Sequence, residues 1–68
     1  MINIASNVKS IRKKRNLTQR ELAKRASVSY TMMSYIEQGI KLPSLSLSVR
    51  LADALECSLD ELVGRKVS

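Results

Sequence analysis

The stretch from Leu17 to Gly39, LTQRELAKRASVSYTMMSYIEQG, constrains the fold most, because it contains two helix starts and a helix stop. Thr18 and Glu21 have the spacing of a capping box, so a helix is expected to begin there. After a short break, the hydroxyl of Ser29 can cap a second helix. Gly39 predicts the end of that helix, because glycine adopts the left-handed conformation at the lowest steric cost.

The second of these helices has two chemically different faces. At about 100° per residue, Met33 and Ile36 fall together and predict an inward, apolar side. The opposite side is expected to face outward and carries Thr31, Ser34, Tyr35 and Gln38. Two short helices joined by so brief a turn are typical of the helix-turn-helix motif, whose second helix enters the major groove of DNA.

Both aromatic side chains, Tyr30 and Tyr35, lie on this helix outside its inward position. Partial burial is the alternative role for Tyr30, whereas the Tyr35 hydroxyl is suited to bond a phosphate or a base. Met32 is expected either to contact a thymine methyl group or to fill a gap in the core. The outward face has no arginine or lysine, so the commonest guanine contact is missing unless Lys41 supplies it from the next loop.

A series of short motifs runs along the chain in a fixed order. They are Leu17-Thr18-Gln19, Glu21-Leu22-Ala23, Val28-Ser29, Ile36-Glu37, Gly39, Pro43-Ser44-Leu45, Leu51-Ala52, Ala54-Leu55 and Ser58-Leu59-Asp60-Glu61-Leu62. In their order and spacing they resemble the DNA-binding domain of phage repressors and Cro proteins, the XRE family, over roughly residues 4 to 63. The resemblance implies an all-α fold, a compact five-helix bundle in which the second and third helices form the helix-turn-helix.

The resemblance also implies roles for single residues. An ion pair between Arg12 and Glu37 would clamp the first helix onto the third. Gln19 would contact a phosphate, and in some family members the matching glutamine also braces a base-reading side chain. Ser27 and Ser48 depart from the family pattern, which usually has a glycine in the turn and often a buried leucine in the fourth helix.

The chain outside this motif predicts three further helices. Asn3 and Ser44 can cap the first and fourth helices, and Ser58 with Glu61 forms a second capping box. Pro43 separates the third helix from the fourth. The expected helices run over about residues 3–16, 18–26, 29–38, 44–56 and 58–64. Residues 1–68 are expected to form a single helix-turn-helix DNA-binding domain with frayed ends at 1–3 and 65–68.

The charge of the chain is unevenly distributed. Residues 1–36 contain eight basic side chains and one acidic side chain, whereas residues 37–68 contain four basic and five acidic ones. The halves therefore carry +7 and −1, which give the net charge of +6. A basic half is expected of a surface that faces phosphates, and a solvated basic face is the alternative. Lys13, Lys14 and Arg15 also suit the dipole at the end of the first helix.

The fourth helix is apolar around much of its circumference, which predicts that it buries two faces. One stripe contains Leu45, Val49, Ala52 and Leu55, and Leu47 and Leu51 form an adjoining stripe. Because one small domain reads few base pairs, a homodimer on half-sites about one helical turn apart is expected. Its predicted surface consists of Leu47, Leu51, Leu59, Leu62, Val63 and Val67.

The predicted function is a sequence-specific regulator of transcription, a small repressor that binds a double-stranded DNA operator as a dimer through the major groove. The candidate DNA-binding residues are Gln19, Arg20, Ser29, Tyr30, Thr31, Ser34, Tyr35, Gln38 and Lys41. A protein-interaction module of the antitoxin type is the alternative. The sequence does not separate phage, restriction-modification and antitoxin contexts.

The chain lacks the residues that other classes of function need. The chain has no histidine, no glycine-rich phosphate loop and a single cysteine, so no enzyme, metal site or cofactor is expected. No apolar run approaches the roughly 18 residues of a membrane span, and no signal peptide is evident, so a cytoplasmic protein is expected.

Overall fold

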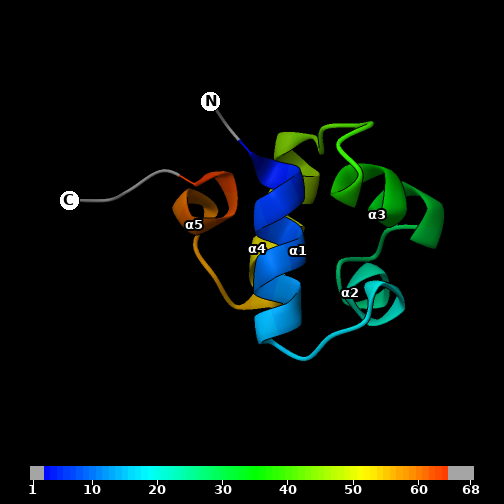
Figure 1. The fold of residues 1–68 in the computed structure, drawn as a ribbon, viewed down its shortest axis with the longest axis horizontal. Coiled ribbons are helices and arrows are strands. Elements are labelled where there is room, and N and C mark those ends of the chain that lie inside the picture. The colour runs from blue at the N-terminus through cyan, green and yellow to red at the C-terminus, as the bar shows by residue number, and fades with distance from the viewer. Residues whose placement is uncertain (1–2, 65–68) are drawn as a thin grey trace.

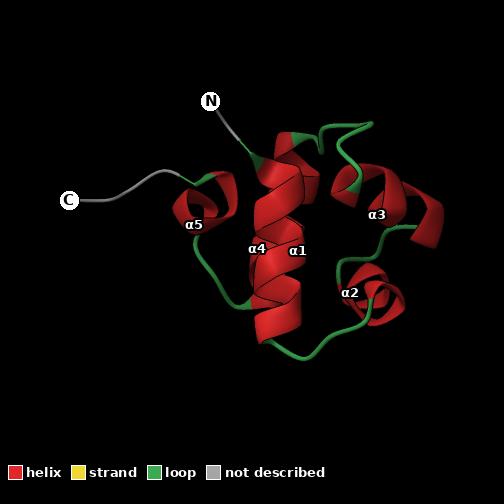
Figure 2. Ribbon diagram, viewed as in Figure 1, coloured by secondary structure: helices red, strands yellow, loops and turns green. Residues whose placement is uncertain are grey.

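The structure is a computed structural model that describes residues 3–64, and within this range all regular elements are α-helices (Figures 1 and 2). The five helices confirm the predicted all-α architecture. They are α1 (Ile4–Lys14), α2 (Gln19–Arg25), α3 (Tyr30–Glu37), α4 (Leu45–Leu55) and α5 (Leu59–Val63). The predicted frayed ends at residues 1–2 and 65–68 lie outside the described residues, whereas Asn3 is the cap of α1.

Two helices form the centre of the molecule, and the other three pack around them. Figure 1 shows α1 in front of α4, with α2 and α3 on one side of this pair and α5 on the other. Helix α1 contacts α3, α4 and α5, and helix α4 contacts α2 and α5. Helices α2 and α3 contact each other, so the helix-turn-helix rests on the central pair through both of its helices.

Each helix begins at the residue that the sequence predicts. In every case the cap side chain accepts a hydrogen bond from the backbone N–H three residues later, and the caps are Asn3, Thr18, Ser29, Ser44 and Ser58. The two predicted capping boxes, at Thr18 and Ser58, are both complete. These local bonds satisfy backbone donors that have no partner inside the helix, which explains why the starts were predictable.

A residue with positive φ follows each of the five helices, and after α4 this residue is Glu56, with a φ of 55°. Gly39 and Gly64 adopt φ angles of 77° and 78°, as predicted for Gly39, and Asn16 follows α1 with a φ of 58°. Ser27 has a φ of 56° in the turn of the motif, where the resembled family usually has glycine. The turn is therefore formed here with a side chain in the left-handed region, at a steric cost that glycine would avoid.

The core is built from aliphatic side chains of all five helices. Its fully buried large members are Leu22, Met33, Ile36, Leu51, Leu55, Leu62 and Val8. Ser48 is also buried, and its hydroxyl donates a hydrogen bond of 2.9 Å to the Ser44 carbonyl. The departure from leucine at this position therefore introduces a polar group with a satisfied hydrogen bond.

The structure corrects the prediction for α4 and for the dimer surface. Leu47, Leu51 and Leu62 are 7%, 0% and 0% exposed, so these three side chains belong to the core and cannot contact a second chain. Conversely, Leu45 and Val49 are 76% and 41% exposed. The buried and exposed positions do not follow the two predicted stripes, because Ala52 and Leu55 of the first stripe are 4% and 0% exposed. The packing of α4 against α1, α2 and α5 decides which of its apolar positions are buried. Of the remaining predicted residues, Leu59 is exposed, Val63 is half-buried, and Val67 lies outside the described residues.

Helices that are distant in sequence are tied together by side chains that donate to helix C-terminal carbonyls. The guanidinium of Arg15 donates to the Leu55 and Glu56 carbonyls at 2.9 and 3.0 Å. Arg50 donates to the Ala26 carbonyl at 3.0 Å, and the Asn7 amide donates to the Leu62 carbonyl at 3.1 Å. These bonds satisfy carbonyls that lack partners at the ends of α4, α2 and α5.

Candidate nucleic-acid interface

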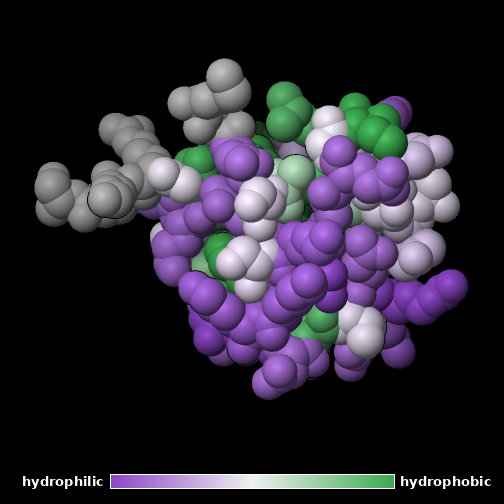
Figure 3. Space-filling model, in the orientation of Figure 1, coloured by the Kyte–Doolittle hydropathy of each residue, from purple (hydrophilic) through white to green (hydrophobic). Residues whose placement is uncertain are grey.

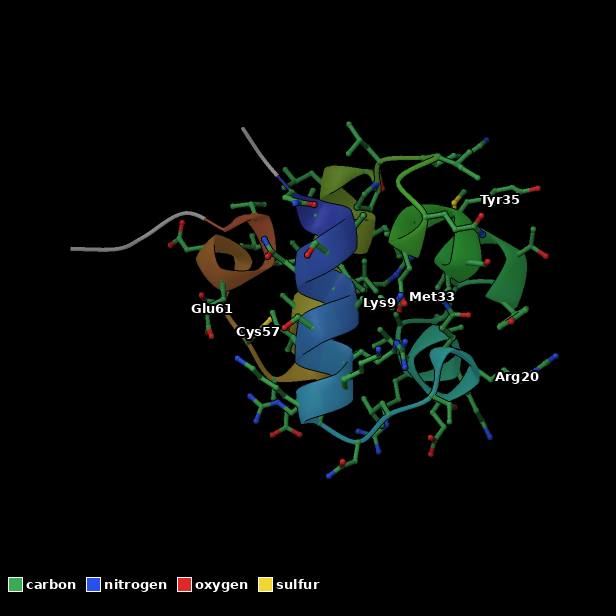
Figure 4. All side chains as sticks on the ribbon, in the orientation of Figure 1. Lys9, Arg20, Met33, Tyr35, Cys57 and Glu61 are labelled. Carbon is green, nitrogen blue, oxygen red and sulfur yellow. The ribbon has the colours of Figure 1, made fainter. Side chains whose placement is uncertain are left out.

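Helix α3 is anchored by one side and exposed on the other, as predicted. Met33 and Ile36 are 0% and 1% exposed, whereas Tyr30 and Tyr35 are 44% and 38% exposed. Thr31 is also exposed. In Figure 4, Tyr35 projects away from the molecule and Met33 lies on the side of α3 that faces α1. Half-burial of Met32, which packs against the core, agrees with its predicted role as a gap-filler.

The ion pair implied by the family resemblance is present and fixes the position of α3. Arg12 donates through Nε and Nη2 to the two carboxylate oxygens of Glu37, at 2.7 and 3.1 Å. Its Nη1 donates to the Leu17 carbonyl at 2.7 Å. This paired geometry joins α1, the start of the motif and the end of α3 into one unit.

Gln19 joins the same network. Its amide nitrogen donates to Oε1 of Glu37 at 3.1 Å, and the side chain is half-buried. The predicted phosphate contact is not tested by this geometry. Gln19 does link the first residue of α2 to the last residue of α3, so it also braces the two helices of the motif.

Several candidate residues already have partners in the protein. The Ser29 hydroxyl accepts a hydrogen bond from the Met32 backbone N–H at 3.1 Å, because it caps α3. The amide of Gln38 donates to the Ser34 hydroxyl at 2.7 Å, which orients both groups on the outward face of α3. Lys41 is exposed in the loop that follows α3.

Arg20 of α2 lies over the first residue of α3. Its guanidinium carbon is 4.4 Å from the centre of the Tyr30 ring, which is a cation–π contact. Figure 4 shows that Arg20 and Tyr35 point to the same side of the molecule although they come from different helices. Arg20 and Tyr30 are both candidates predicted from the sequence, but the contact between them depends on the packing of α2 against α3.

An open concavity of about 690 Å³ lies at the start of α2, beside these residues. It is lined by Arg12, Lys13, Asn16, Leu17, Thr18, Gln19, Arg20 and Tyr30. Sequence reasoning did not name Lys13 and Asn16 as site residues. Their position between the end of the first helix and the capping box was the signal that could have identified them.

Cys57 lies away from this surface, near α5 (Figure 4). The pKa of its thiol is raised, first by burial and then by the negative charge of Glu61, while Arg15 opposes the shift. The thiol is therefore held in its neutral form, and the half-buried Cys57 side chain packs against the core.

A family model described as helix-turn-helix matches residues 8–62. The chain belongs to the helix-turn-helix family. Two phage repressors are among its relatives, which confirms the resemblance. The transcriptional repressor RstR of cryptic phage CTXphi from Vibrio cholerae is 39% identical over 94% of this chain and 57% of its own length. The immunity repressor protein of Bacillus phage phi105 is 35% identical over 96% of this chain and 45% of its own length.

The chain thus spans about half the length of these two repressors. Solved structures of two other proteins match the fold closely. The P22 c2 repressor in complex with a synthetic operator superposes with a TM-score of 0.87 at 27% identity, over 97% of this chain and 100% of that chain. The restriction-modification controller C.AhdI from Aeromonas hydrophila gives 0.84 at 25% identity, over 87% and 89%.

Proposed function

We propose that this chain binds double-stranded DNA in a sequence-specific way and regulates transcription, as a repressor at an operator. The observation that carries the proposal is the construction of α3. Its inner side is held by Met33, Ile36 and the Arg12–Glu37 pair, and its outer side presents hydroxyl, amide and aromatic groups. A rigid helix with such a face can enter the major groove and bond base edges.

Charge supports the same proposal. The part of the chain that forms α1, α2 and most of α3 carries seven net positive charges, because residues 1–36 hold eight basic side chains and one acidic one. Hydrophilic side chains cover the face of α1 and α2 in Figure 3. Contacts with phosphates supply most of the affinity of DNA-binding proteins and fix the protein on the duplex.

A homodimer is part of the proposal, and its proposed surface differs from the one predicted from the sequence, because Leu47, Leu51 and Leu62 are buried. Among residues 3–64, the apolar side chains with the largest exposed fractions are Leu42, Leu45 and Ile40, at 78%, 76% and 60%, and Val49 adjoins Leu45 on α4. Green side chains gather over the link between α3 and α4 at the upper edge of Figure 3. A two-fold dimer needs one self-complementary patch, and we assign it to these four residues, called the link patch below.

The test is the dependence of affinity on salt and on sequence. A duplex enriched from a random pool is compared with a scrambled duplex of the same composition. We expect the enriched duplex to bind at least about 10³-fold more tightly at physiological salt, with log K falling linearly as log salt rises. Equal affinity for both duplexes would refute sequence-specific regulation. An operator-binding protein shares the compartment of its DNA, so the proposal includes a cytoplasmic location.

A protein-interaction module is the second candidate, and the exposed link patch is the observation that favours it. In that case the patch would bind a partner protein and not a second copy of the chain. A flat salt response and no enrichment of any duplex, together with a stable complex through the patch, would support this alternative.

A further inference from the structure

Helix α3 lacks the side chain that most often recognises guanine. A guanidinium that bonds O6 and N7 of guanine is the commonest specific contact in the major groove, yet residues 30–37 include no arginine or lysine. The structure brings such a group to α3 from the neighbouring helix. The guanidinium of Arg20 lies 4.4 Å from the ring centre of Tyr30, the first residue of α3.

The Arg20–Tyr30 pair lies at the position from which helix-turn-helix proteins contact DNA bases. In a helix-turn-helix the N-terminal residues of the second helix contact base edges, and Tyr30 begins that helix. When a guanidinium covers an aromatic ring, its flat face is occupied and its N–H donors remain at the edge. Arg20 is exposed and makes no hydrogen bond or ion pair with another side chain within residues 3–64.

The other arginines between residues 3 and 64 are less suited to this role. Arg12 is paired with Glu37, and Arg15 and Arg50 donate to helix C-terminal carbonyls. Arg25 is the last residue of α2, whereas Arg20 is the second. Arg20 is therefore the arginine whose charge lies over the start of α3.

We infer that Arg20, oriented by Tyr30, reads a guanine in each half-site by donating two hydrogen bonds to O6 and N7. Arg20 is the specificity-determining residue, and Tyr30 is a positioning residue. The inference rests on the proposed DNA-binding function and adds to it the base that is read and the helix that reads it.

The first experiment selects duplexes from a random pool with the wild-type protein, Arg20→Ala and Arg25→Ala in parallel. We expect the wild-type selection to contain a position dominated by guanine, and Arg20→Ala to lose this preference while keeping the others. Arg25→Ala is the matched control, because it removes an exposed arginine from the same helix. Its selected sequences should equal those of the wild type.

The second experiment replaces that guanine by 7-deazaguanine, which lacks the N7 acceptor. Wild-type affinity should fall about tenfold, since a bidentate contact contributes roughly 1–3 kcal/mol of discrimination. The affinity of Arg20→Ala should not respond to this change. Tyr30→Phe keeps the ring and should retain the guanine preference, whereas Tyr30→Leu should weaken it at this position alone.

The outcomes separate the inference from the proposed function. If Arg20→Ala weakens binding to all duplexes equally and lowers the salt slope by about one, Arg20 contacts a phosphate and the inference is wrong while DNA binding stands. A Tyr30→Leu effect spread over every position would refute the positioning role. If the wild-type protein enriches no sequence at all, the proposed function itself fails.

Discussion

The carboxylate of Glu37 helps to fix the position of α3 and therefore of its outward face. Its side chain is 2% exposed, and it accepts hydrogen bonds from both Arg12 and Gln19. An almost buried charge is tolerable only while it is paired, because removing its partner leaves the desolvation cost uncompensated. The position of α3 therefore depends on the Arg12–Glu37 pair, which is not part of the outward face of the helix.

Arg12→Leu is expected to destabilise the protein by about 3 kcal/mol, because it leaves the Glu37 charge without its cation. The double variant Arg12→Leu/Glu37→Leu should be destabilised less than the sum of the two single variants, since it buries no unpaired charge. Urea unfolding of the four proteins measures this coupling. Lys13→Ala, at an exposed position, should change the free energy of unfolding by less than about 0.5 kcal/mol. Additive losses would show that the two side chains act independently.

The ionisation of Glu21, at the start of α2, makes the stability of the protein depend on pH. Its pKa lies below the ordinary value of 4.5 because the carboxylate accepts hydrogen bonds from the backbone and side chain of Thr18. The folded state therefore releases the proton more readily than the unfolded state. The resulting stabilisation is present above pH 4.5 and is lost as pH falls through the lowered pKa.

Glu21→Gln should accordingly be less stable than the wild type at neutral pH, and the two proteins should converge in acid. The glutamine keeps the hydrogen-bonding shape of the capping box and removes only the charge. Urea midpoints measured from pH 7 down to pH 3 test this expectation. A difference that does not change with pH would show that the charge of Glu21 makes no contribution.

At the scale of helices, the starts could be predicted from sequence because their signals are local. A cap such as Ser29 and the amide it bonds are three residues apart, so no tertiary information is needed. Some helix ends could not be predicted in this way, because their carbonyls accept hydrogen bonds from side chains that are distant in the sequence. The expectation for Arg15 was a favourable position in the last turn of α1, whereas its guanidinium reaches the end of α4, and no pattern of nearby residues indicates this contact.

Arg15→Ala should therefore loosen the end of α4 more than the end of α1. We expect a loss of about 1 kcal/mol in the free energy of unfolding, as for a hydrogen bond from a charged donor that is partly exposed to water. Amide hydrogen exchange should accelerate around Leu55 and Cys57. Lys14→Ala, in the same turn of α1, is the control and should leave exchange in α4 unchanged. Equal effects of both variants would indicate a dipole effect and no specific cap.

At the scale of the whole molecule, the face of α4 that is buried could not be derived from its pattern. Leu45 and Leu47 are both leucines at the start of a helix that is apolar around much of its circumference, yet they are 76% and 7% exposed. The choice depends on which side of α4 meets α1, α2 and α5, and that is a property of the assembled bundle. The inward side of α3 was predictable because its other side is polar. The Arg20–Tyr30 contact was not predictable from the sequence, because it depends on how α2 packs against α3.

The exposed side of α4 leads to the last prediction. Figure 3 shows apolar side chains over the link between α3 and α4, and residues of the link patch are up to 78% exposed. Exposed apolar clusters on small proteins mark interaction surfaces. If a second copy covers this patch, the C-terminal ends of the two α3 helices approach the two-fold axis of the dimer.

Leu45→Lys should then abolish the dimer and weaken binding to a duplex with two half-sites far more than binding to one half-site. Its exposed position means that folding should be unaffected, which circular dichroism verifies. Sedimentation equilibrium, with and without the two-site duplex, measures the association. Leu59→Lys, on the exposed side of α5, is the comparison that separates the link patch from the surface first predicted. A dimer that survives Leu45→Lys and dissociates with Leu59→Lys would return the interface to α5.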